Sequence, residues 1–183
     1  MGLRHRRKEK RTAEEHALWK FERQRRQNLQ AEPGQFPVTL VLDHLKPDFN
    51  IGKIFRSAHA FGACDVHLIG IEHFDPSPAV GSFKWVPAHF YKSWEECLST
   101  LKADQYSFYA LCPTAQQYLA QTTLSRKSAF ILGHEEFGIR SEILSDPMVT
   151  PLAIEQFGDV DSLNVSVAAS ISLYEYCKQH SNG

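Results

Sequence analysis

Short apolar runs alternate with helical patterns along most of the chain. Apolar runs typical of buried strands occupy residues 38–42, 66–69, 106–111, 129–132 and 149–152. Between and after them, the spacing of apolar residues predicts helices over residues 50–63, 94–102, 115–119, 140–144 and 162–178. This alternation predicts an α/β fold, with a mostly parallel sheet and helices on both faces. Ligands of such sheets bind beyond the carboxyl ends of the strands, so the candidate loops begin at Asp43, Cys112, Gly133 and Ala153.

The last predicted helix has both a start signal and an apolar stripe. Ser162 is a natural N-cap residue, and we expect the helix to begin there. Its buried stripe is expected to consist of Leu163, Val167, Ile171 and Tyr174.

The first 37 residues follow a different pattern. Thr12 to Glu15 matches a capping box, which predicts a helix that continues to about Leu29. The apolar stripe of this helix is narrow, so we expect an arm that docks on the rest or projects from it. Residues 32–37 contain two prolines and a glycine and predict a linker. The chain therefore divides into an N-terminal arm and linker, residues 1–37, and a domain, residues 38–183.

Composition narrows the class of protein. The chain has 183 residues, 43% hydrophobic and 22% charged, which excludes disordered, collagen-like and coiled-coil proteins. No apolar run is long enough for a membrane helix, and no secretory signal follows the first charges. The four cysteines are scattered and the nine histidines show no ligand spacing, so we expect a reduced, cytoplasmic protein without a metal.

The net charge of −1 conceals a strong asymmetry. Residues 1–30 carry 10 Lys and Arg against 4 Asp and Glu, a charge of +6, whereas the remaining residues carry −7. A basic arm of this kind is typical of proteins that bind a polyanion, although a solvated helical tail is the open alternative. The candidate contacts are Arg6, Arg7, Lys8, Lys10, Arg11, Arg23, Arg25 and Arg26.

Three segments carry residues that suggest chemistry. In residues 50–56, Asn50 could cap a helix and Arg56 could be an ordinary surface side chain. The glycine-rich segment 133–138 is neither a GxGxxG loop nor a P-loop, and its acidic centre suits a neutral or positively charged cofactor better than a phosphate. Residues 162–168 place Asn164 and other poor helix formers at a helix N-terminus, which favours developing negative charge. Each segment alone also fits an ordinary turn or cap.

In this order, the three segments resemble those of the SpoU/TrmH family of RNA ribose 2′-O-methyltransferases, within the SPOUT superfamily. The first motif is matched by Asn50 and Arg56, the second by Gly133, Glu135 and Gly138, and the third by residues 154–168. The resemblance covers roughly residues 38–178, and the three motifs together are highly specific.

The resemblance implies an S-adenosylmethionine (AdoMet)-dependent RNA ribose methyltransferase with a C-terminal trefoil knot. It also implies a homodimer whose active site lies at the interface. The catalytic residues would be Arg56, Asn50, Ser162 and Asn164. The cofactor would be held near Leu111, Gly133, Glu135, Gly138, Ile154 and Leu163, and the basic arm would contact RNA.

The chemistry refines two of these roles. A guanidinium has a pKa above about 12, so we interpret Arg56 as a cation beside the attacking oxygen and not as a base. We expect Glu135 to brace its loop, without a part in proton transfer. The chain departs from the family at Glu155 and Gln156, which replace the usual Pro-Met in a loop that borders the cofactor.

Two other classes remain as alternatives. A catalytically inactive RNA-binding protein would keep the fold, but the intact catalytic positions count against it. A nucleotide-binding enzyme of another kind is disfavoured because GxGxxG and P-loop motifs are absent. We expect tRNA as the substrate in preference to rRNA, because a compact domain with a short basic arm lacks a large separate rRNA-binding domain.

Overall fold

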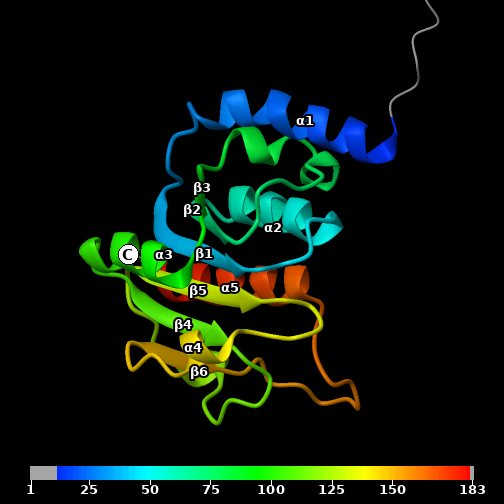
Figure 1. Cartoon of the computed structure of the whole chain (residues 1–183). Coiled ribbons are helices and arrows are strands. Elements are labelled where there is room, and N and C mark those ends of the chain that lie inside the picture. The colour runs from blue at the N-terminus through cyan, green and yellow to red at the C-terminus, as the bar shows by residue number, and fades with distance from the viewer. Residues whose placement is uncertain (1–11, 182–183) are drawn as a thin grey trace, which may run out of the picture.

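Residues 12–181, which the computed structural model describes, form a six-stranded parallel sheet between two layers of helices (Figure 1). The strand order is β3-β2-β1-β5-β4-β6. The strands are β1 Phe36–Asp43, β2 Ala63–Ile69, β3 Ala88–Tyr91, β4 Ser107–Leu111, β5 Ser128–Gly133 and β6 Val149–Leu152. The α-helices are α1 Ala13–Asn28, α2 Phe49–Ala60, α3 Trp94–Ala103, α4 Ser141–Leu144 and α5 Val165–His180. Single 3₁₀ turns occur at η1 Ser77–Ala79, η2 Ser82–Lys84 and η3 Leu119–Gln121.

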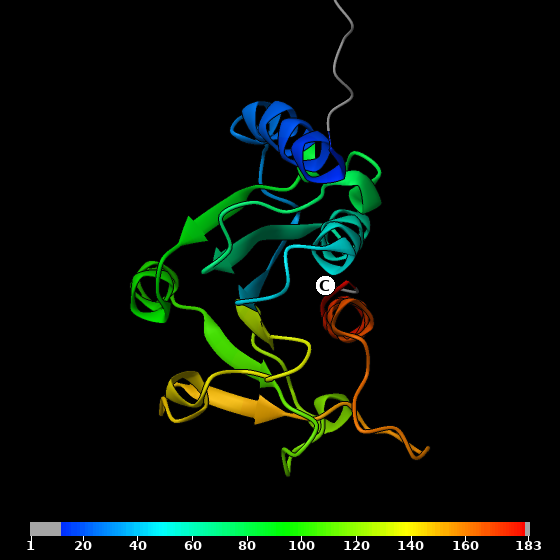
Figure 2. The ribbon, with the colours of Figure 1, turned by 45° about the vertical axis from the view of Figure 1, so that its right-hand side comes forward.

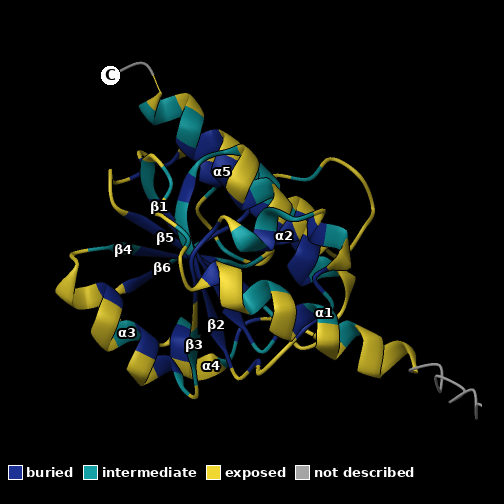
Figure 3. Ribbon diagram, turned by 90° about the horizontal axis from the view of Figure 1, so that it is seen from above, coloured by how far each residue is buried: buried dark blue, intermediate teal, exposed yellow. Residues whose placement is uncertain are grey.

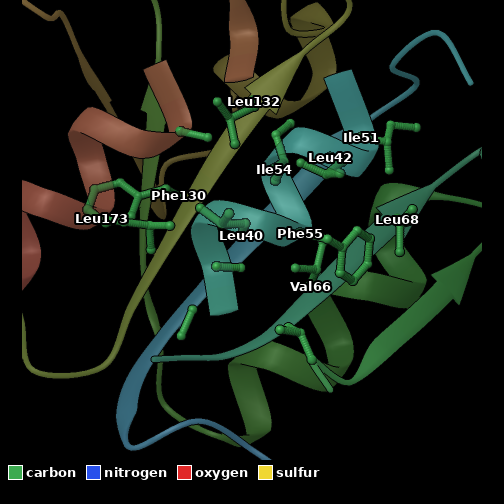
Figure 4. Close-up of a cluster of buried hydrophobic side chains, with 14 of the residues drawn as sticks. Leu40, Leu42, Ile51, Ile54, Phe55, Val66, Leu68, Phe130, Leu132 and Leu173 are labelled. Atoms are coloured by element: carbon green, nitrogen blue, oxygen red, sulfur yellow. The ribbon is translucent and has the colours of Figure 1, made fainter. Parts of the chain in front are cut away.

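The helices divide between the two faces of the sheet, as the alternating pattern predicts. Figure 2 shows α2 and α5 on one face and α3 and α4 on the other. On the first face, Leu40 and Leu42 of β1 pack with Ile54 and Phe55 of α2 and with Leu173 of α5 (Figure 4). A second cluster of buried side chains fills the space under α3 and α4. All strands contribute buried residues, so the sheet is covered on both sides.

Three local features differ from the prediction. The helix expected at residues 115–119 does not form, because its backbone bonds elsewhere: Leu119 N donates to Ala153 O at 2.8 Å, and Ala153 N donates to Gln117 O at 2.8 Å. The strand β3 was not expected, because its sequence Ala-His-Phe-Tyr is not a continuous apolar run. The helix α2 also ends at Ala60, before the expected Ala63, and Gly62 follows with φ +64°.

The start and the buried face of α5 differ from the prediction. Asn164, not Ser162, is the N-cap, because its side chain accepts a hydrogen bond from Ser166 N. The helix buries Val165, Ala169, Leu173 and Tyr176, among others. In contrast, two members of the expected stripe are exposed: Val167 at 45% and Tyr174 at 60%. This helix has apolar residues on more than one side, so spacing alone could not choose the face that meets the sheet.

The N-terminal helix α1 is docked. The predicted capping box is present, with Thr12 N bonded to Glu15 Oε2 and Glu15 N bonded to Thr12 Oγ1. Phe21 is buried among Phe74, Phe83 and Phe90. The remaining surface of α1 is largely exposed (Figure 3).

The C-terminal end of α1 is also anchored. Asn28 is buried, and its Nδ2 donates to Phe83 O and Val86 O, both at 2.6 Å. The linker after α1 is shorter than expected, because β1 already begins at Phe36. Of the helices within residues 12–181, none is long and apolar enough to cross a membrane.

Candidate functional site

The loops that follow β4, β5 and β6 line one pocket, together with the start of α5. Because the sheet is parallel, the carboxyl ends of β1, β4, β5 and β6 lie at the same edge. Beside them is a pocket of about 480 Å³, which is the size of a small-molecule site. Its lining includes all six predicted cofactor residues, Leu111, Gly133, Glu135, Gly138, Ile154 and Leu163. Of the predicted catalytic residues, Ser162 and Asn164 also line it.

The glycine-rich loop after β5 is closed by close backbone contacts. His134 N donates to Gly138 O at 3.0 Å, and Gly138 N donates to His134 O at 2.8 Å. A Cβ on Gly133 would lie 2.2 Å from the backbone of Gly138 and Ile139, so no other residue fits there. Gly138 has φ +70°, which L side chains rarely adopt, and a Cβ there would face open space. The two glycines thus let the backbone itself form one wall of the pocket.

A chain of side-chain hydrogen bonds joins the three motifs. Asn164 Oδ1 accepts bonds from Ser166 N and Oγ, at 3.0 and 2.6 Å. Asn164 Nδ2 donates to Asn50 Oδ1 at 3.2 Å, and Asn50 Nδ2 donates to Glu135 Oε1 at 2.9 Å. These two bonds join side chains that are 85 and 114 positions apart in the sequence. They bring the three motifs together at one edge of the pocket. Asn50 serves this chain and does not cap α2, whose N-cap is Asp48.

Glu135 braces its loop, as the sequence predicts. Its Oε2 accepts a hydrogen bond from Lys46 N at 3.1 Å, while its Oε1 accepts the bond from Asn50. Beside it, Lys46 Nζ lies 3.2 Å from Glu136 Oε2. The carboxylate of Glu135 therefore ties the loop after β1, the start of α2 and the loop after β5 to one another.

Arg56 stands apart from this cluster. It lies six residues after Asn50, or about 9 Å along the axis of α2. Its side chain is exposed and does not line the pocket. Among residues 12–181, the structure shows no hydrogen bond or ion pair from its guanidinium to another side chain. Arg56 is thus a solvent-exposed side chain of α2.

Asp43 was missed as a site residue. It is fully buried at the end of β1, and its carboxylate accepts bonds from Arg140 Nε at 2.8 Å and Arg140 N at 3.2 Å. His44 Nδ1 lies 2.8 Å from the same carboxylate. Asp43 therefore fixes the end of the glycine-rich loop against the end of β1. A charged residue that closes an otherwise apolar strand is the sequence signal that could have identified it.

The chemistry of the pocket suits a mostly apolar ligand with polar and positively charged groups. Leu111, Leu152 and Ile154 supply apolar wall, while Glu135 and Glu136 supply negative charge. The Oε1 atom of Gln156, also in the lining, is buried and has no hydrogen-bond partner within the described chain. A buried acceptor without a partner costs free energy, so this atom calls for a donor from a ligand.

The predicted basic contacts fall into two groups. Arg6, Arg7, Lys8, Lys10 and Arg11 lie outside the described residues. On α1, Arg26 is exposed, and the guanidinium of Arg23 lies 5.5 Å from the centre of the Trp19 ring. Arg25 is held within the chain, because it lies over the ring of Phe90 at 4.7 Å and bonds the side chain of Asn28.

Comparison with known sequences gives a consistent result. The model of the SpoU rRNA methylase family matches residues 37–174. The 23S rRNA (guanosine-2′-O-)-methyltransferase RlmB of Nitrosomonas europaea is 32% identical over 149 residues, which are 79% of this chain and 57% of that protein. The tRNA (guanosine(18)-2′-O)-methyltransferase of Thermus thermophilus is 28% identical over 148 residues, 78% of this chain and 75% of that protein. The chain spans 38% and 57% of the length of two curated relatives.

A solved structure has the same fold. The SpoU methyltransferase AviRb of Streptomyces viridochromogenes, in complex with the cofactor AdoMet, superposes with a TM-score of 0.71 at 25% identity. The superposition covers 82% of this chain and 60% of AviRb.

Proposed function

Since the chain belongs to the SpoU methylase family, we propose that it is an RNA ribose 2′-O-methyltransferase that uses AdoMet. The observation that carries this proposal is the hydrogen-bond chain from Asn164 through Asn50 to Glu135 beside the pocket. We propose tRNA as the substrate, because this chain spans more of the tRNA-modifying relative than of the rRNA-modifying one. The C-terminal trefoil knot implied by the family resemblance is part of the same proposal.

The pocket fits AdoMet. Bound AdoMet supplies a methyl group on a positively charged sulfonium. The apolar walls can enclose an adenine ring, and the carboxylates of Glu135 and Glu136 complement a positive charge. The unpartnered Oε1 of Gln156 can accept a hydrogen bond from an amino or hydroxyl group of this cofactor.

The chain's own residues would position the ribose and stabilise charge. The attacking 2′-hydroxyl must lose its proton and gains negative charge in the transition state. Asn50, Ser162 and Asn164 orient the ribose at the pocket, and Arg56 provides the cation beside the oxygen and the adjacent phosphate. Because Arg56 lies outside the pocket lining of its own chain, this role requires an RNA that reaches from the pocket to α2 or a partner subunit whose pocket lies near α2.

Methylation assays test this function. Purified protein should transfer labelled methyl groups from AdoMet to unmodified tRNA, and mass mapping of nuclease fragments should place the label on one ribose. A parallel assay with ribosomal RNA separates the two substrate classes. AdoMet binding without any transfer to either RNA would favour a catalytically inactive RNA-binding protein and would contradict the proposal.

Gln156 gives a test of the cofactor site. We expect Gln156→Met, which installs the usual residue of the family and removes the buried acceptor, to weaken AdoMet binding about 3- to 10-fold. This range corresponds to the net value of one hydrogen bond. Isothermal calorimetry measures the affinity directly. The matched control is Gln156→Glu, which keeps an acceptor atom at this position. If Gln156→Met binds AdoMet with unchanged affinity, Gln156 makes no hydrogen bond to AdoMet.

We further propose a homodimer through the exposed side of α2 and α5. These helices lie together, with Ser57 Oγ 2.8 Å from Ser170 Oγ. Apolar side chains remain exposed on them: Phe49 at 63%, Val167 at 45% and Tyr174 at 60%. Burial of this surface would be favourable, at about 25 cal/mol per Å². Light scattering at micromolar concentration should give twice the mass of the chain, and a monomer would contradict the proposal.

A further inference from the structure

A cluster of metal-binding residue types lies away from the pocket, on β2 and β3. Side chains alternate between the faces of a strand, so Asp65 and His67 share one face of β2. The register pairs His67 of β2 with His89 of the edge strand β3, which places His89 on the same face. The two histidines are 22 positions apart in the sequence, so their spacing does not show that they are neighbours. No metal site was expected from the sequence.

Each histidine lies as close to the Asp65 carboxylate as two ligands of one ion lie to each other. His67 Nε2 lies 3.1 Å from Asp65 Oδ1, and His89 Nε2 lies 3.3 Å from Asp65 Oδ2. One ligand atom from each of the three residues can be chosen so that all lie within 4.8 Å of one another. In a tetrahedral site with bonds of about 2.0–2.1 Å, neighbouring ligand atoms are about 3.3 Å apart. The two histidine–carboxylate distances already match this value, and the widest separation within the set would have to shorten by at most about 1.5 Å.

The surroundings suit a site with one open position. The exposed fractions of the side chains are 3% for His67, 17% for Asp65 and 45% for His89. The site is thus closed around His67 and open to water at His89. Tyr91 Oη lies 3.0 Å from His67 Nδ1, where it can hold the ring in place through the nitrogen that does not bind the ion.

The carboxylate of Asp65 lies between the two imidazoles, with one oxygen facing each ring. An anionic carboxylate beside two imidazoles is a complete set of protein ligands for an open zinc site.

We propose that Asp65, His67 and His89 bind a divalent transition-metal ion of the Zn²⁺ class, which fastens the edge strand β3 to β2. Two imidazoles favour such an ion over Mg²⁺ or Ca²⁺, which prefer oxygen ligands. Both rings bind through neutral Nε2, so the proton of each moves to Nδ1, and in His67 this proton is then donated to Tyr91 Oη. Water occupies the open position.

Calorimetry of the full-length protein, stripped with EDTA and titrated with Zn²⁺, tests the site. We expect one saturable equivalent per chain, and His89→Gln should weaken it at least 10-fold. At a Zn²⁺ concentration 100 times Kd, the melting temperature should rise by about 5–10 °C. The matched control is His73→Gln, which removes an exposed histidine outside the cluster and should bind Zn²⁺ as the wild type does.

A second readout keeps the result clear if a variant folds poorly. Co²⁺ bound in the proposed tetrahedral geometry should show visible absorption that Asp65→Asn and His89→Gln both lose. Circular dichroism should show that His89→Gln, whose side chain is nearly half exposed, retains the fold. Absence of saturable Zn²⁺ binding, or equal binding by His89→Gln and His73→Gln, would mean that the cluster is only an internal hydrogen-bond network and would overturn the proposal.

Discussion

Replacement of Arg56 by alanine is expected to reduce turnover at least about 100-fold while AdoMet affinity stays unchanged. Arg56 is exposed on α2, outside the pocket lining, so its removal leaves the cofactor site intact. In the complex with RNA, its charge would lie beside the oxygen that becomes negative. At an effective dielectric near 20, a charge about 4 Å away contributes roughly 4 kcal/mol. Loss of one such stabilising donor typically lowers kcat about 10²- to 10³-fold.

Single-turnover assays on saturating RNA would measure this loss, and calorimetry would measure AdoMet affinity. Lys53→Ala is the matched control, since Lys53 is another exposed cation on α2. We expect it to retain turnover. Arg56→Lys should recover part of the rate, because the charge remains but the planar group does not. Near-normal turnover of Arg56→Ala would remove Arg56 from the mechanism.

Removal of residues 1–11 is expected to weaken RNA binding strongly and to flatten its salt dependence. These residues carry six of the cations of the basic arm and a single glutamate. If each cation neutralises one phosphate, the slope of log K against log salt should decrease in magnitude by up to about 4–5. AdoMet affinity should not change, because the pocket lining begins at Leu111.

The docking of α1 determines where this truncation must end. Deletion of residues 1–30 would remove Phe21 and Asn28, which are buried against the segment that holds Phe83. That larger deletion would therefore damage the fold as well as the charge. Truncation before Thr12 leaves the capping box of α1 in place.

Filter binding or fluorescence anisotropy over a range of salt concentrations would give the slope. A full-length variant in which the six cations of residues 1–11 become glutamine separates charge from chain length, and we expect it to behave like the truncation. RNA affinity and a salt slope equal to those of the wild type would identify these residues as a solvated tail.

The pattern of the chain predicted most of the elements because burial acts on each of them locally. Strands such as β1 and β5 are covered on both faces and therefore consist mainly of apolar residues. The residues that line the pocket could likewise be predicted from the sequence. The ends of parallel strands share one edge of the sheet, and the motif residues lie just beyond them.

The wrong predictions concern segments whose structure depends on contacts with residues far away in the sequence. Residues 115–119 pair with Ala153 instead of forming a helix. The face of α5 was predicted wrongly because only the sheet and α2 select among its apolar sides. In both cases the competing local structures differ little in free energy, so tertiary contacts choose between them.

By itself, the sequence determined the α/β class, the basic charge of residues 1–30 and the positions of the three motifs, because these depend on residue type and short spacing. Only the tertiary structure decided that Asn50, Glu135 and Asn164 form one hydrogen-bond chain. It alone also placed His67 beside His89, through the register of β2 and β3. Hydrogen bonds and metal coordination act over about 2–3 Å. Contacts this short between residues far apart in the chain depend on strand order and register, which hydrophobic periodicity does not specify.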